Sequence, residues 1–361
     1  MTLRVFTPYC NPIGWSSRLK NHRRFEDAIF ATSGVALTTI ELTYGDRPFD
    51  LPSREGITRL RYRSGDVLWH KENLIALAER QTSYEYAAYV DGDILFLDPE
   101  WAVKAVRTLQ VLPVAQITSW LINMGPPPHE EGTRTAPSFM SVYLGDYETH
   151  RTEWFNNGSP AATSRHGYPG GCWAWRKQAY HDMDGMLDRC ILGSADYHMA
   201  FGLVDLPTDP VLTNGDYTKA YQDYIEAWRK QAFSAIRGHV GLVPGTAMHL
   251  WHGRTEDRGY ETRPKILVRN KYDPRLDVRV RDDGLLELTD SKPMLRRDLL
   301  TYFASRHEDS VDTPETDRRR GCRLHEQSSS TFITPPGRAA DPPRRRQRLG
   351  HGPRGVQPAS T

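Results

Sequence analysis

The sequence contains no apolar run long enough to cross a membrane as a helix. Its longest apolar stretches have the length of strands, whereas a spanning helix needs roughly 20 mainly apolar residues. Residues 1–6 lead directly into a strand-like segment and lack the charged, apolar and small-residue regions of a signal peptide. We therefore expect a cytoplasmic protein without a membrane span.

Cysteine is also scarce, and the chain has no internal repeat. The 361 residues include 4 cysteines that lack the spacing of a metal site: Cys10, Cys172, Cys190 and Cys322. This pattern indicates reduced structural thiols. Hydrophobic residues make up 38% and charged residues 25%, an ordinary composition for a soluble protein of one large or two modest domains.

Positive charge is concentrated at the C-terminal end. From Arg318 onward, ten arginines face only two acids, so this stretch carries +8 and the rest of the chain, at +2 for the whole, carries −6. Residues 307–361 are rich in Pro, Ser and Arg and have too few large apolar side chains to bury a core. We predict a folded domain over residues 1–306 and a disordered basic tail over residues 307–361.

The first third of the chain alternates strand-like and helix-like patterns. Strands are predicted at residues 3–7, 35–42 and 86–90, and helices at residues 25–30 and 70–80. This order implies an α/β fold in which crossover helices connect parallel strands. Ligands in such sheets bind outside the carboxyl ends of the strands.

The later part of the chain is less regular. Residues 126–165 are rich in Pro, Gly, Ser and Thr, which predicts loops with short strands. Denser structure is expected again from residue 168 to 203, and a helix at residues 221–236.

Two carboxylates flank a glycine directly after the predicted strand at residues 86–90. In this tripeptide, Asp91-Gly92-Asp93, the acids stand at the mouth of a buried strand, where they need a partner. A divalent cation that holds a nucleotide diphosphate would supply it. Because Asp-Gly pairs are also common in turns, an ordinary turn is the alternative.

Two histidines three residues apart, His249 and His252, lie in a strand-like segment late in the chain. Both side chains can reach one ion from a turn or strand end, and imidazole is a common ligand for metals such as manganese. They would add the protein ligands that an acid pair alone lacks. The alternative is a pair of ordinary surface or core histidines.

Two small-residue segments precede these histidines. Gly170 and Gly171 permit close approach of a ligand to the backbone, and Trp173 and Trp175 offer flat faces to a sugar ring. Asp196 follows a run of small residues and could accept a proton from an attacking hydroxyl. The alternatives are a tight turn with core aromatics and a helix N-cap, respectively.

Taken in order, these segments resemble the metal-dependent glycosyltransferases of the GT-A fold, in particular their β-1,4-galactosyltransferase-like branch. That branch has a Lys-x-x-Leu-Leu-Asn helix, an Asp-x-Asp strand end, a double glycine, an acidic cluster and a late metal-binding histidine. The matching residues here are Lys71, Asp91, Asp93, Gly170, Gly171, Asp196 and His249 or His252. The chain is also similar to glycosyltransferases encoded by bacteriophages, which carry a His-Leu-Trp-His-Gly segment and a Lys-Ile-Leu run, here at residues 249–253 and 265–267.

The resemblance covers roughly residues 3–306. It implies a Rossmann-like, mostly parallel mixed sheet flanked by helices, a Mn²⁺ or Mg²⁺ ion, and a nucleotide-diphosphate sugar, most often a UDP-sugar, as donor. It also implies transfer with inversion. The animal galactosyltransferases have a run of acids where this chain has only Asp196, so the resemblance fixes neither the sugar nor the acceptor.

We expect metal ligands at Asp91, Asp93 and one or both of His249 and His252, and a general base at Asp196. The expected contacts to the nucleotide sugar are Thr7, Tyr9, Glu41, Asp46, Lys71, Asp91, Gly170, Gly171, Trp173 and Trp175. Positive charge near the phosphates would come from Arg254, Arg258 or Lys265.

Other functions stay open at this point. A metal-dependent nucleotidyltransferase or phosphotransferase also uses paired acids. A nucleic-acid-binding protein could act through the basic tail, although that tail has almost no aromatic side chains to stack on bases. The acceptor of a glycosyltransferase could be a glycan, a modified DNA base, as a phage origin would allow, or a protein, and no residue pattern gives the oligomeric state. A phage-encoded enzyme would act in the host cytoplasm.

Overall fold

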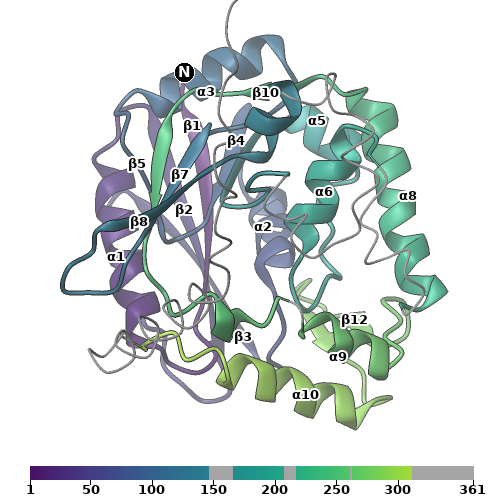
Figure 1. Ribbon diagram of the computed structural model, residues 1–361. Helices are drawn as coiled ribbons and strands as arrows, with labels where there is room; N and C mark the ends of the chain where they lie inside the picture. Colours follow the sequence, from purple (N-terminus) through teal and green to yellow (C-terminus); the bar gives the residue numbers. More distant parts are fainter. Residues whose placement is uncertain (146–165, 207–216, 261, 311–361) are drawn as a thin grey trace, which may run out of the picture. The chain divides into compact units, whose positions relative to one another are not determined.

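A computed structural model describes residues 1–145, 166–206, 217–260 and 262–310 (Figure 1). The chain divides into two compact units, Met1–Val311 and Asp312–Thr361, and the second lies outside the described residues. The expected disorder of residues 311–361 and part of the loop expected at 126–165 therefore fall on residues that are not described. Within the described part, no helix combines the length and the apolar character that a membrane span requires.

A seven-stranded sheet forms the centre of the described structure. Its strands run in the order β10-β6-β9-β4-β1-β2-β3. In this described sheet, β9 alone is antiparallel to its neighbours, and the other pairs are parallel. The strands are β1 (Leu3–Cys10), β2 (Val35–Tyr44), β3 (Ile57–Ser64), β4 (Tyr86–Val90), β6 (Val114–Gln116), β9 (Cys172–Arg176) and β10 (Val240–Leu242). The expected mixed, mostly parallel sheet is confirmed.

Helices cover both faces of this sheet (Figure 1). These helices are α1 (Ser16–Phe30), α2 (Lys71–Gln81), α3 (Trp101–Val111), α5 (Lys177–Asp182), α6 (Ala195–Leu203) and α8 (Lys219–Ile236). A 3-10 turn, η2 (Glu256–Arg258), and two further helices, α9 (Pro264–Arg269) and α10 (Pro293–Ala304), follow later in the chain. Proline suits the first positions of α9 and α10 because the missing N–H would have no partner there.

The alternation of side chains along each strand builds two separate cores. In β4, Tyr86, Ala88 and Val90 pack in the core that includes side chains of α1 and α3. Ala87 and Tyr89 point to the opposite face and pack with α2, α6 and α8. Because β4 is buried on both faces, it reads in the sequence as a continuous apolar run.

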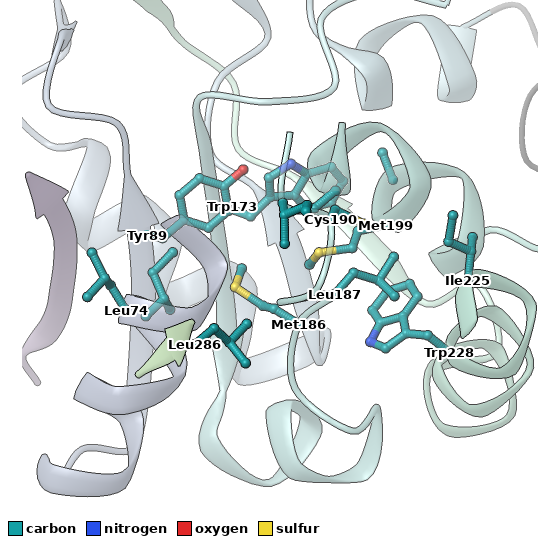
Figure 2. Close-up of a cluster of buried hydrophobic side chains, with 14 of the residues drawn as sticks. Leu74, Tyr89, Trp173, Met186, Leu187, Cys190, Met199, Ile225, Trp228 and Leu286 are labelled. Carbon is teal, nitrogen blue, oxygen red and sulfur yellow. The ribbon is translucent and has the colours of Figure 1, made fainter. Parts of the chain in front are cut away.

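The second of these cores lies beside the end of β4. Figure 2 shows Leu74 of α2, Tyr89 of β4 and Trp173 of β9 on one side of it, with Ile225 and Trp228 of α8 on the other. This packing fixes α2 and α6 against the sheet, and these two helices carry the charged side chains that line the end of β4.

A smaller four-stranded sheet lies next to the central one. Its order is β5-β11-β7-β8, and its strands are β5 (Ile94–Phe96), β7 (Trp120–Met124), β8 (Gly132–Pro137) and β11 (Thr246–His249). A two-stranded hairpin, β12 (Val278–Val280) and β13 (Leu286–Leu288), completes the described strands. Because β5 begins right after the Asp91-Gly92-Asp93 turn, the small sheet brings late segments of the chain to that turn.

Two features differ from the expectation. We did not expect β3, whose alternating Arg59, Arg61 and Arg63 give it a polar pattern; it forms an edge of the sheet, where charged side chains are tolerated. The folded part also continues past Arg306 to Ser310, because Glu308 is buried and Asp309 binds the first turn of α1.

Candidate active site

The Asp91-Gly92-Asp93 turn follows β4 and is tightly enclosed. The backbone N–H of Asp91 donates to the carbonyl of Gly171 at 2.8 Å, and that of Ile94 donates to the carbonyl of Asp91 at 3.1 Å. A Cβ atom at Gly92 would lie 2.4 Å from Nδ1 of His22. Only glycine fits between the two acids, because the buried His22 ring of α1 occupies the space of a side chain.

The pairing of β5 with β11 brings the late histidines to this turn. The two strands are antiparallel, with His249 opposite Ile94. The N–H of Leu250 donates to the carbonyl of Asp93 at 2.8 Å. Asp93 and His249 are 156 positions apart in the chain, and this strand pair makes them neighbours.

Three side chains converge here with the geometry of a metal site. One ligand atom from each of Asp93, His249 and His252 lies within 4.8 Å of the others. Nε2 of His252 is 3.1 Å from Nε2 of His249 and 3.3 Å from Oδ2 of Asp93, and Nε2 of His249 is 3.7 Å from Oδ1 of Asp93. Among the described residues, the buried Oδ1 of Asp93 has no hydrogen-bond partner. An orphaned carboxylate oxygen that faces two imidazole nitrogens suits a divalent cation.

The charges of the group favour an ionised Asp93 and a neutral His252. Burial works to raise the pKa of Asp93, but His252 and His249 outweigh it and hold this pKa well below its usual range. Burial, supported by the nearby Arg258, lowers the pKa of His252. A carboxylate and neutral imidazoles are the forms that bind metals.

Asn123 of β7 is a member of this site that we did not expect. Strand β7 pairs with β11 so that Asn123 lies opposite His249. Its Oδ1 is 3.0 Å from Nδ1 of His249 and accepts a hydrogen bond when that nitrogen carries the hydrogen. This bond leaves the lone pair of His249 on Nε2, the nitrogen that faces Asp93 and His252. Asparagine is depleted in strands, which is the one sequence signal that could have marked it.

Asp91 belongs to a second, neighbouring group of charges. Nζ of Lys71 lies 3.5 Å from Oδ1 of Asp91, 3.7 Å from Oδ2 of Asp196 and 3.6 Å from Oε1 of Glu72. Burial raises the pKa of Asp91 to about 6, despite the opposite pull of Lys71. The structure thus separates the two acids of the turn: Asp93 faces the histidines, and Asp91 shares one lysine with Asp196.

Asp196 lies in the first turn of α6 and leans against Gly170. The N-cap position is taken by Ser194, whose φ is 74°, so Asp196 is not the capping residue. A Cβ atom at Gly170 would be only 2.3 Å from Oδ2 of Asp196. Gly170 therefore leaves the space that the carboxylate of Asp196 fills, and a quarter or so of this side chain, 28%, stays exposed to solvent.

A pocket opens beside the turn, at the carboxyl ends of β1 and β4. It includes five of the expected residues, Tyr9, Lys71, Asp91, Asp93 and His252, and also Pro8, which directly precedes Tyr9. The other lining residues were not expected: Cys10, Arg18, Asn21, His22, Leu68, Trp69, His70, Gly92 and Phe303. Most of them carry no sequence motif and reach the pocket only through the packing of α1, α10 and the segment before α2.

Seven of the ten expected donor contacts are not lining residues of this pocket: Gly170, Gly171, Trp173 and Trp175, at β9 and directly before it, and Thr7, Glu41 and Asp46. Thr7 is fully buried within β1. Glu41 is buried and accepts from the backbone N–H groups of Asp50, at 2.5 Å, and Leu51, at 2.9 Å, so it holds the segment that follows β2. Asp46 lies exposed in the turn after β2.

The two tryptophans belong to the core, which is the alternative that the sequence left open. Trp175 is 1% exposed, and its Nε1 donates to Oε1 of Glu79 at 2.8 Å. Trp173 is 5% exposed, and its Nε1 donates to the carbonyl of Pro169 at 2.8 Å. Neither ring is a lining residue of the pocket, because β9 lies inside the sheet and its side chains enter the cores.

The expected phosphate-binding cations lie at different distances from the acids. Arg258 is close enough to influence the pKa values of Asp93 and His252, and its buried Nε has no hydrogen-bond partner among the described residues. Lys265 is exposed on α9. Arg258 therefore contributes positive charge at the metal group, and Arg18 also interacts electrostatically with Asp93.

Comparisons with known proteins give structural likenesses only. No family model matches the sequence, and no curated protein matches it. Among solved structures, the chain is similar to a mannosyltransferase from Pyrobaculum calidifontis in complex with GDP-Man and Mn²⁺, with 11% identity, 91% of this chain and 81% of that chain covered, and a TM-score of 0.41. It is also similar to a variant of Drosophila β-1,4-galactosyltransferase 7 in complex with manganese, UDP-Gal and xylobiose, with 12% identity, coverage of 82% and 99%, and a TM-score of 0.35.

A third likeness is to a CMP:2-keto-3-deoxy-manno-octonic acid synthetase complexed with CTP, with 11% identity, coverage of 68% and 90%, and a TM-score of 0.31. At identities and TM-scores this low, none of these likenesses establishes a function for this chain.

Proposed function

We propose that this protein is a metal-dependent glycosyltransferase that moves a sugar from a nucleotide-diphosphate sugar to an acceptor hydroxyl. One observation carries the proposal. Asp93, His249 and His252 form a group able to hold a metal ion at a pocket by the carboxyl ends of parallel strands. Lys71, which also lines this pocket, pairs with both Asp91 and Asp196 and so links Asp196 to the same turn. A metal group and a separate carboxylate beside one pocket suit a reaction with an anionic leaving group and a hydroxyl nucleophile.

Asp93, His249 and His252 would hold the metal ion, with Asp91 at the edge of the same turn. Two imidazole ligands favour Mn²⁺ over Mg²⁺, which prefers oxygen ligands. When bound, the ion would offset the negative charge of the departing diphosphate. Arg258 adds a fixed positive charge on the same side.

Asp196 would act as the general base. Its partly exposed carboxylate would take the proton of the acceptor hydroxyl while the acceptor oxygen bonds to the anomeric carbon. The bond from that carbon to the diphosphate oxygen breaks, and its electron pair leaves with the nucleoside diphosphate. Attack opposite the leaving group inverts the anomeric centre. Lys71 would hold the carboxylates of Asp91 and Asp196 in place, because it pairs with both of them.

The donor would bind with its diphosphate at Asp93 and His252 and its nucleoside toward Tyr9 and Trp69, which line the same pocket. The order of the sequence motifs supports a UDP-sugar and the β-1,4-galactosyltransferase-like branch, including its phage-encoded members. The proposed acceptor is a hydroxyl group of a glycan, a modified DNA base or a protein.

The test is a screen of UDP- and GDP-sugars with Mn²⁺, Mg²⁺ or a chelator, read by protection against thermal unfolding and by release of nucleoside diphosphate. We expect Mn²⁺-dependent protection by one donor and slow release of nucleoside diphosphate in water. Release of pyrophosphate from a nucleoside triphosphate would instead identify a nucleotidyltransferase. No protection by any nucleotide sugar, with or without metal, would contradict the proposal.

A further inference from the structure

The last described residues, 306–310, pack against α1 and against the loop that carries His252. We name this segment the C-terminal clasp. Its central residue, Glu308, is 1% exposed. The carboxylate of Glu308 accepts hydrogen bonds from Nε and Nη2 of Arg18, the latter at 2.7 Å, and from Nε of Arg306 at 2.6 Å. A buried carboxylate between two guanidinium groups is a well-satisfied arrangement that fixes all three side chains.

The clasp also caps helix α1. The N-cap position of α1 is Trp15, whose side chain makes no capping hydrogen bond. Asp309 supplies the missing acceptors, since its Oδ2 is 2.9 Å from the N–H of Ser16 and its Oδ1 is 2.7 Å from that of Ser17. A carboxylate at a helix N-terminus pairs with free N–H groups and with the positive end of the helix dipole. The clasp therefore sets where α1 begins, one turn before Asn21 and His22 of the pocket.

A third set of contacts holds the loop that carries His252. Gly253 has φ +89°, and a Cβ atom there would lie 2.8 Å from Cα of Glu308, so the loop and the clasp backbone touch directly. Nε1 of Trp251 donates to the carbonyl of Ser310 at 3.0 Å. From the other side, Nδ2 of Asn21 donates to the carbonyl of Trp251 at 2.7 Å. His252 thus sits between two residues that the clasp holds.

We infer that the C-terminal clasp is a positioning element of the metal and donor pocket, with Glu308 as its central residue. Arg18, Asn21 and His252 all line the pocket. Arg18 is bonded to Glu308 of the clasp, Asn21 donates to Trp251, which is bonded to Ser310, and His252 follows Trp251 in the chain. No described hydrogen bond joins the clasp to the side chains of the metal ligands. The clasp acts through Arg18, through the Trp251–Gly253 backbone and through the charge of Glu308, which interacts with His252. The inference rests on the proposed function, because it names what holds the proposed site together.

If the clasp only stabilised the fold, its loss would lower stability without a selective effect on Mn²⁺ or donor binding. A matched control variant separates this structural role from a positioning role. Asp298 of α10 is also a largely buried acid, 8% exposed, and pairs with Arg269 and Asn270. It is not a lining residue of the pocket. Glu308→Gln and Asp298→Asn therefore each remove the charge of a largely buried acid that pairs with an arginine, but only the first lies on the clasp.

The experiment uses the full chain and measures Mn²⁺ affinity by electron paramagnetic resonance, donor KM and kcat, and the midpoint of thermal unfolding. We expect Glu308→Gln to weaken Mn²⁺ binding about tenfold, in the range of losses seen when supporting partners of metal ligands are removed. Donor KM should rise by a similar factor while kcat at saturation changes little. Glu308→Asp, which keeps the charge, should recover part of the affinity, and Asp298→Asn should lower only the unfolding midpoint.

A milder variant keeps the test decisive if Glu308→Gln does not fold. Trp251→Phe removes the bond to Ser310 but keeps a ring, and we expect Mn²⁺ affinity to fall two- to threefold. Equal Mn²⁺ affinity in wild type, Glu308→Gln and Trp251→Phe would overturn the inference and leave the proposed function standing. A wild-type protein that binds neither Mn²⁺ nor a nucleotide sugar would overturn both.

Discussion

The substitution Gly170→Ala, which adds a single methyl group, should lower the catalytic rate of this protein with little effect on its folding stability. The Cβ atom of an alanine at this position would stand 2.3 Å from Oδ2 of Asp196. Gly170 has no φ in the left-handed region, so alanine suits its backbone. The substitution Gly170→Ala therefore acts by one steric contact with the proposed general base.

The size of the effect follows from that distance. An ordinary contact needs about 3.4 Å, so the carboxylate oxygen has to move by about 1 Å, and a misplacement of about 1 Å can cost about 100-fold in rate. The carboxylate is the partly exposed end of a side chain and can turn away at little cost. We therefore expect the free energy of unfolding to change by less than about 1 kcal/mol, in the range of ordinary small substitutions.

The assay is the steady-state release of nucleoside diphosphate at saturating donor, acceptor and Mn²⁺. We expect kcat to fall about 100-fold while Mn²⁺ and donor affinities stay near those of the wild type, because Asp93 and the histidines are untouched. Gly65→Ala is the control: no described atom lies within 4 Å of its added Cβ, and its φ is not left-handed. A Gly170→Ala enzyme that is folded and as active as wild type would refute the role given to Asp196.

Three further predictions concern the metal group and the core. Asp93→Ala should abolish Mn²⁺-dependent turnover and the Mn²⁺-induced rise in unfolding temperature, and retention of either would contradict the ligand assignment. Asn123→Ala should weaken Mn²⁺ binding about tenfold, because Nδ1 of His249 loses its acceptor; an unchanged affinity in a titration would argue against that role. Burial raises the pKa of Glu79 to about 8, against the Trp175 hydrogen bond, so the folded chain keeps a proton that the unfolded chain releases near pH 4.5. The contribution of Glu79 to the free energy of unfolding should then fall by a few kcal/mol as pH rises from about 4.5 to about 8, at about 1.4 kcal/mol per pKa unit as an upper limit. Urea titrations should therefore show a steeper fall in wild type than in Glu79→Gln, which keeps the contributions of Asp91 and Glu72.

Local patterns in the sequence were enough to predict three strands of the central sheet, β1, β2 and β4, and the position of the first site residues. The apolar run of β4 and the β-branched run of β2 predicted strands, and the helix formers of residues 70–80 predicted α2. These elements depend on propensity and on burial of whole faces, which neighbouring residues express directly. The polar edge strand β3 was missed because its arginines conceal the alternation.

Tertiary structure decided that Asp91 and Asp93 have different partners. From sequence, Asp91 and Asp93 look equivalent, and both were expected to bind the metal. The pairing of β5 with β11 directs Asp93 to His249 and His252, while the packing of α2 and α6 gives Asp91 and Asp196 a common lysine, Lys71.

By itself, then, the sequence determined three neighbouring strands of the sheet, the turn with its two acids, and the residues first expected to bind a metal or take a proton. It did so because these features depend on residue type and short-range spacing. The partners Asn123, His22 and Glu308 were decided only by the folded chain. Each reaches the site from a different element across a long sequence separation, and such contacts are set by strand pairing and helix packing, which leave no local pattern.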